Sequence, residues 1–204
     1  MKKKILLIYP PSPVLNREDR CQQPTRDLIV IPPLPPADLM YLAAVAEKEG
    51  LEAKIQDYSQ GGNFERDLKE FKPDYLVVNI ATPTLVHDLE AVKKAKEICP
   101  DIITIAKGAA FLALADRIMK EHDELDIGIL GEAENTLREI LEAIPKEHIL
   151  GIYYKENGEV KFTGVRPFIE DLDSLPFPAR HLVDNNIYRR PDNNKVQATI
   201  KVSR

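Results

Sequence analysis

Short apolar runs alternate along the chain with longer segments in which apolar residues recur at helical spacing. This alternation is typical of a parallel α/β sheet. Strands are predicted over residues 5–9, 53–57, 75–80, 102–106 and 126–130. Helices are predicted over residues 36–49, 63–70, 84–98, 111–121 and 134–143. We expect a doubly wound, three-layer α/β domain of the Rossmann or flavodoxin-like class, with a five-stranded parallel sheet in the order 2-1-3-4-5.

The pattern changes after Pro145. Two apolar segments flank Asn157-Gly158, a pair that strongly favours a β-hairpin turn. A Pro-rich stretch follows, and Val196–Arg204 alternates in the manner of a strand. We therefore expect a domain over residues 1–148, a hairpin extension over 149–165, a linker over 166–195, and over 196–204 the first strand of a second domain that is otherwise absent.

The predicted last strand affects how the C-terminal segment is expected to behave. With no partner strand it would expose an edge and an apolar face, which promote pairing with other chains. Residues beyond about Arg180 are thus expected to be mobile, or ordered by self-association with another copy.

Composition excludes several function classes. The 204-residue chain has a net charge of −5, which argues against a general nucleic-acid binder. No apolar run approaches the roughly 20 residues that span a bilayer. Cys21 and Cys99 form neither a metal-ligand spacing nor a disulfide framework. These features predict a cytoplasmic chain with no membrane span.

In an open parallel sheet, ligands bind beyond the carboxyl ends of the strands. Four loops should meet there, over residues 10–35, 81–84, 107–110 and 131–134. Each has a plain structural alternative, because Thr84 is equally suited to cap a helix, the glycines to make turns, and Glu132 and Glu134 to complement a helix N-terminus. The four histidines are scattered and match no ligand spacing.

The residues of these loops argue against several functions that are common among α/β domains. A phosphoacceptor domain needs acidic residues after the first strand, where this chain has Pro10-Pro11. A dinucleotide site needs a Gly-rich turn at the same place. The chain also has no P-loop, no Gly-x-Ser-x-Gly elbow and no plausible Cys–His pair.

Several motifs follow one another along the chain in the order found in one protein family. The first strand ends in Pro-Pro, and Pro32–Ala44 reads Pro-Pro-Leu-x-x-Ala-x-Leu-x-Tyr-Leu-Ala-Ala. Thr82-Pro83 follows the third strand, Gly131–Glu134 reads Gly-Glu-x-Glu, and Asp171–Arg180 reads Asp-Leu-Asp-Ser-Leu-Pro-Phe-Pro-Ala-Arg. Together these resemble the N-terminal cobalamin (B12)-binding domain of radical S-adenosylmethionine enzymes, over the whole chain.

The resemblance implies cobalamin as cofactor and partner, with no catalytic and no metal-ligating residue in this chain. Residues 10–16 contain no His to ligate cobalt, so the implied mode is base-off and His-off, with the dimethylbenzimidazole tail in the crevice. Weak lower ligation would favour a reduced cobalt that accepts a methyl group. The implied contacts are Pro10, Pro11, Thr82, Pro83, Thr84, Lys107, Gly108, Ala109, Gly131 and Glu132.

Lys107 departs from the family pattern, which commonly has Gly-Gly at this turn. Its side chain would obstruct the tail, turn outward, or reach the phosphate of the tail. An alternative function follows from this departure: a degenerate fold without cofactor that serves as a substrate-recognition or docking module.

The resemblance also implies a parent radical S-adenosylmethionine enzyme, with methyl transfer among the reactions open to it. In the family, a strand like residues 198–204 is usually followed by Gly-Cys-Pro and a Cys-x-x-x-Cys-x-x-Cys motif for a [4Fe–4S] cluster. Neither motif is in this sequence. The cluster and S-adenosylmethionine would belong to a C-terminal radical barrel, and the chain alone is expected to be non-catalytic.

Overall fold

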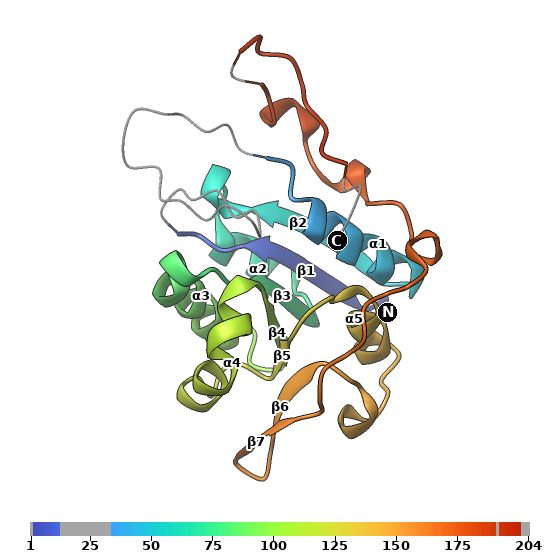
Figure 1. Cartoon of the computed structure of the whole chain (residues 1–204). Coiled ribbons are helices and arrows are strands. Elements are labelled where there is room, and N and C mark those ends of the chain that lie inside the picture. Colours follow the sequence, from blue (N-terminus) through green and yellow to red (C-terminus); the bar gives the residue numbers. More distant parts are fainter. Residues whose placement is uncertain (1, 13–33, 191, 201–204) are drawn as a thin grey trace.

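The computed structural model describes residues 2–12, 34–190 and 192–200, and its described strands form one sheet (Figure 1). The order across the sheet is β2-β1-β3-β4-β5-β6-β7. Strands β1 to β5 are parallel, and the pair β6–β7 adds antiparallel to β5. The predicted order 2-1-3-4-5 is confirmed, with the hairpin extending the β5 edge. The strands are β1 (Lys4–Tyr9), β2 (Glu52–Asp57), β3 (Tyr75–Asn79), β4 (Ile103–Lys107), β5 (Ile127–Ile129), β6 (Ile152–Glu156) and β7 (Glu159–Phe162).

Helices cover both faces of this sheet. One face carries α1 and α5, and the other carries α2, α3 and α4 (Figure 1). The helices are α1 (Ala37–Lys48), α2 (Phe64–Phe71), α3 (Leu85–Ile98), α4 (Ala109–Glu121) and α5 (Glu134–Leu141). All five were expected within a few residues of these bounds, and Asn63 caps α2 as its residue type predicts, by accepting from the Arg66 N–H at 2.9 Å.

Two apolar cores result from the alternation of side chains along the central strands. Leu7, Val77 and Ile105 face α1 and α5, whereas the residues next to them face α2, α3 and α4. Because both faces are covered, the strands are almost continuously apolar. This two-sided packing fixes which side chain ends each strand at the carboxyl edge.

The hairpin turn forms where the sequence predicts it. Asn157 and Gly158 both have positive φ, at 53° and 80°, as a two-residue turn matched to the strand twist requires. Tyr153 and Phe162 stack across the two strands with ring centroids 4.3 Å apart. The extension therefore closes the edge beside β5.

Residues 196–200, the described part of the strand predicted over 196–204, form no strand in this structure, and their pairing with a further domain stays a prediction. Val196 makes one isolated antiparallel bridge to Arg189, and residues 197–200 have no strand geometry. The segment folds back on itself instead, because a turn with Asn194 at φ 54° brings the Gln197 N–H to 2.9 Å from the Tyr188 carbonyl oxygen. Residues 201–204 lie outside the described part of the chain.

The segment beyond Arg180 also contacts the domain itself. Tyr188 is 2% exposed, and burial together with the nearby Asp57 carboxylate raises the pKa of its hydroxyl. His181 pairs with Glu47 of α1 at 2.9 Å. Order in this segment thus has a source within the chain, while self-association stays a prediction.

We predict that Tyr188→Ala releases this segment. Removing a buried aromatic ring costs about 3–5 kcal/mol of stability. Hydrogen exchange should show the Gln197 amide protected in the dilute monomer and unprotected in the variant. Ile187→Ala is the matched control, because Ile187 is 44% exposed and should leave protection unchanged. An unprotected Gln197 amide in the unmodified monomer would contradict the docked arrangement.

Candidate functional site at the carboxyl edge of the sheet

The carboxyl ends of the parallel strands meet at one edge, and the chain direction reverses there between β1 and β3. From β1 the chain passes outward to β2, and then returns to β3 on the other side of β1. Such a switch point leaves a crevice between diverging connections, and it is where ligands of open α/β sheets bind. The residues around it form the candidate site.

Four polar side chains converge at this point, and we call Tyr9, Asp38, Asn79 and Lys107 the switch-point cluster. The Asp38 carboxylate accepts from the Tyr9 hydroxyl at 2.6 Å, from the Asn79 amide at 2.6 Å and from the Lys107 ammonium at 2.7 Å. The last two donors share Oδ2. The four residues come from the ends of β1, β3 and β4 and from the first turn of α1.

The period of the strands explains why these residues meet. Tyr9, Asn79 and Lys107 each lie two positions after an apolar residue that faces α1, so they face α1 as well. Asn79 is paired in register with Lys107. Asp38 lies in the first turn of α1, where a carboxylate also complements the helix dipole. The cluster is thus a polar layer on top of the α1-facing core.

The Lys107 side chain lies inside this layer. Its side chain and that of Asp38 are each 11% exposed, so the ion pair is largely desolvated. Of the three orientations expected for Lys107, the outward one is wrong. Asp38 and Asn79 were not anticipated as site residues, because nothing local marks their convergence with Lys107 from three separate elements.

The loop after β3 is held by an acidic residue that sequence reasoning missed. Asp88 is fully buried, and its Oδ2 accepts from the Ala81 N–H at 2.9 Å and from the Thr84 hydroxyl at 2.8 Å. Thr84 donates to Asp88 and makes no side-chain cap to α3, so the capping alternative is wrong. Thr82 and Pro83 are exposed at the edge. The signal that could have found Asp88 is its i+4 spacing from Thr84.

The turn after β4 requires glycine, because the neighbouring backbone leaves no room for a side chain. Gly108 has φ 122°, and a Cβ built on it would lie 2.3 Å from the Ile80 carbonyl oxygen. The Ile80 N–H donates to the Lys107 carbonyl oxygen at 2.7 Å, which joins the ends of β3 and β4. Ala109 follows as the first residue of α4. The position of the Lys107 backbone is therefore fixed from both sides.

The turn after β5 connects the edge to the segment that follows the hairpin. Gly131 is exposed with φ 86°, and Glu132 Oε2 accepts from the Ile169 N–H at 2.6 Å. Arg166 forms an ion pair with Glu139 of α5. Glu132 thus holds residues 166–169 against the edge, whereas its expected contact with a cofactor stays a prediction.

The loop after β1 is described only at its ends. Pro10 is buried and Pro11 is exposed. The expectation that residues 10–35 shape a ligand's lower face falls mainly on residues 13–33, which lie outside the described residues. Pro35 and Pro36 are buried at the start of α1.

Two large apolar side chains stand exposed beside the edge. Val86 and Leu112 lie in the first turns of α3 and α4 and are 69% and 71% exposed. His87, next to Val86, is half exposed and lies 3.5 Å from the Glu90 carboxylate. The edge thus combines a buried polar layer with an apolar rim.

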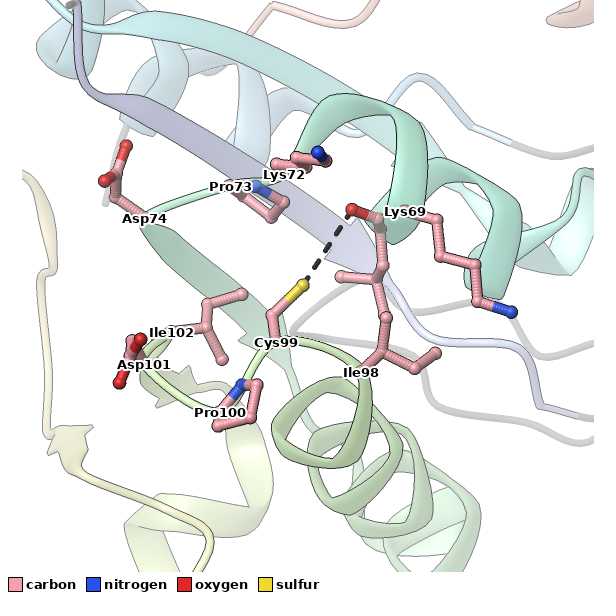
Figure 2. A pocket seen from close by; sticks show the side chains of 10 residues that line it. Lys69, Lys72, Pro73, Asp74, Ile98, Cys99, Pro100, Asp101 and Ile102 are labelled. Carbon is pink, nitrogen blue, oxygen red and sulfur yellow. Dashed lines mark hydrogen bonds between the residues drawn. The ribbon is translucent and has the colours of Figure 1, made fainter.

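A cavity near the amino ends of the strands, at the opposite edge of the sheet, is a poor candidate for the functional site. Its volume is 480 Å³, and it is lined by the ends of α2 and α3 and the loops that lead from them into β3 and β4. Figure 2 shows the lining residues, among them Asp74, Cys99 and Ile102. The Cys99 sulfur points toward the Leu68 carbonyl oxygen at 3.9 Å, and burial raises the pKa of this thiol. A thiol held in its protonated form is a weak nucleophile.

Two kinds of feature are absent from the described ranges 2–12, 34–190 and 192–200. They contain no group of three or more His, Cys, Asp or Glu side chains placed to hold a metal ion. None of their helices is long and apolar enough to cross a membrane.

Comparison with known proteins gives the site a context. The sequence profile of the B12 binding domain family matches residues 32–141. An uncharacterized methyltransferase of Pyrococcus horikoshii is 28% identical over 193 residues, covering 91% of this chain and 40% of that protein. An anaerobic magnesium-protoporphyrin IX monomethyl ester cyclase of Cereibacter sphaeroides is 24% identical over 154 residues, covering 69% of this chain and 25% of that protein.

A solved structure shares the fold. The radical S-adenosylmethionine methyltransferase TsrM from Kitasatospora setae, solved with cobalamin and a [4Fe–4S] cluster bound, superposes with a TM-score of 0.61 at 18% identity. The match covers 96% of this chain and 36% of TsrM. The chain thus spans well under half the length of these relatives.

We predict that Gly108→Ala destabilises the domain by roughly 3 kcal/mol or more, because backbone strain and a clash with Ile80 act together. Gly131→Ala is the matched control: it has a similar positive φ but no heavy atom within 4 Å of the added Cβ, so about 1 kcal/mol is expected. Urea unfolding of both variants measures the difference. Equal losses would show that the approach to Ile80 does not constrain the turn.

Proposed function

Because this chain belongs to the B12 binding domain family, we propose that it binds cobalamin at the carboxyl edge of its sheet and serves as the cobalamin-binding part of a radical S-adenosylmethionine enzyme. The observation that carries the proposal is the family match over residues 32–141. That span contains α1 through α5 and eight of the ten expected site residues, all but Pro10 and Pro11.

The residues of the edge suit a large amphipathic ring. Val86 and Leu112 offer exposed apolar contacts in the first turns of two neighbouring helices. Thr82 and the backbone at Gly131 are exposed beside them and would hydrogen-bond the amide side chains of the corrin. These residues would hold the ring over the edge, above the switch-point cluster.

The binding mode we propose is base-off and His-off. Residues 10–16 contain no His, and the nearest alternative on this edge, His87, is paired with Glu90. When bound, cobalamin would supply a cobalt with weak lower ligation, suited to accepting and donating a methyl group. The protein's part is to hold the ring and leave its lower face without a protein nitrogen.

The rest of the parent enzyme is also part of the proposal. A radical barrel carrying the [4Fe–4S] cluster and S-adenosylmethionine would be the main partner, and methyl transfer would be the reaction of the whole protein. We propose that residues 1–148 form the cofactor domain, with the hairpin over 149–165 and the linker over 166–195 leading to the barrel, in a cytoplasmic enzyme.

We predict that the purified chain, incubated with hydroxocobalamin and desalted, retains close to one equivalent of corrinoid. After reduction to cob(II)alamin, its electron paramagnetic resonance spectrum should show no hyperfine splitting from an axial nitrogen. Lack of retained visible absorbance would contradict the proposal. Splitting that disappears in His87→Ala would show a His-on mode instead.

A second measurement separates the enzyme class from the docking alternative. The genomic sequence directly after the codon for Arg204 should encode a Cys-x-x-x-Cys-x-x-Cys motif. A different domain there would remove the radical enzyme from the proposal, while cobalamin retention would still test the binding function alone.

A further inference from the structure

The Lys107–Asp38 ion pair lies beside the switch point, where ligands of this fold class enter the crevice between the strand ends. We propose that this pair is a latch and that Lys107 is a specificity-determining residue, which sets how readily the chain accepts corrinoids that carry a nucleotide tail. This inference rests on the proposed function, because it concerns how a corrinoid fits the same edge.

The geometry of the latch follows from its two fixed ends. Lys107 is the last residue of β4, and β3 separates β4 from the switch point. The Lys107 side chain reaches the first turn of α1, where Nζ lies 2.7 Å from the Asp38 carboxylate. Asn79, at the end of β3, donates to the same carboxylate oxygen. The ammonium and the carboxylate therefore join the β4 end to α1 over the end of β3.

A corrin ring and a nucleotide tail place different demands on this latch. The ring would lie over the edge, where the Val86 and Leu112 side chains are already exposed and could contact it. A tail that enters the crevice must separate two charged groups whose side chains are each only 11% exposed. Breaking a desolvated ion pair is costly because the attraction between the two charges is lost and neither charge fully regains water.

Recognition of the tail's phosphate by Lys107 is the competing role, and the contacts argue against it. The Asp38 carboxylate lies against the ammonium and is held there by Tyr9 and Asn79. A phosphate that approached Lys107 would meet this negative charge at close range, and like charges disfavour such a contact. The latch is therefore the role that fits the observed contacts.

The test compares two probes on one protein. Hydroxocobalamin carries the nucleotide tail, and cobinamide has the same ring without the ribose, phosphate and base. Titration by visible absorbance gives a Kd for each. For each variant, the cobalamin Kd is divided by the cobinamide Kd, and this ratio is compared with the ratio for the unmodified chain. The comparison cancels the free energy needed to remove the tail base from cobalt, since that free energy belongs to the ligand.

Lys107→Gly should tighten cobalamin binding at least about tenfold and leave cobinamide within about threefold, since it removes both the charge and the bulk that close the crevice. Asp38→Asn keeps the size and one acceptor oxygen but weakens the pair, so it should shift the ratio in the same direction by a smaller factor. Lys120→Ala removes the 2.8 Å ion pair with Asp116 on the exposed face of α4 and should leave the ratio unchanged.

The outcomes are distinct. An equal change for both corrinoids, no change for either, or weaker cobalamin binding in Lys107→Gly would overturn the latch while the proposed function stands. Absence of binding by either corrinoid to any variant would overturn the proposed function, and the latch with it. Unfolding curves of each variant establish that the measured protein is folded.

Discussion

The arrangement of the carboxyl edge depends on the hydrogen bonds that the Asp38 carboxylate accepts. This carboxylate joins α1 to the ends of β1, β3 and β4 through three donors, each within 2.7 Å. Buried polar groups need such partners, because an unpaired one loses its hydration without compensation. One side chain in the first turn of a helix therefore sets where that helix begins relative to three strands, and it fixes the shape of the crevice into which a ligand would extend.

The same helix is held from its outer side. The Ala179 N–H donates to the Met40 carbonyl oxygen at 3.0 Å, and His181 reaches Glu47 at 2.9 Å. Glu132, at the end of β5, binds the backbone at Ile169 in the same connecting segment. The residues after the hairpin thus link the site loops to α1 and α5.

The sequence predicted the regular part of the fold because that part rests on local periodicity. The central strands β1 and β3 are apolar on both faces and the helices have apolar stripes, so the five strands and five helices were predicted within a few residues of their bounds. The site was predicted less well, since its contacts are tertiary. Lys107 was recognised as unusual, but Asp38 resembled any acidic residue in a first helical turn, and Asp88 resembled a surface residue of α3. The alternation of residues 196–200 predicted a strand that this structure does not form, where a turn and the burial of Tyr188 set the path of the segment.

The placement of the ion pair favours a role in ligand selection over a role in stability. Replacing a buried ion pair with apolar residues of similar volume is often neutral or stabilises a protein by about 1–4 kcal/mol, so a buried ion pair is weak evidence for a role in stability. Directly beneath the cluster, Leu7, Val77 and Ile105 show that the α1-facing core is apolar up to the last residue of each strand. The polar layer begins where the strands end, at the edge where ligands of this fold class bind. A charged pair confined to that level influences what enters the crevice, and the apolar layers beneath it provide the stability.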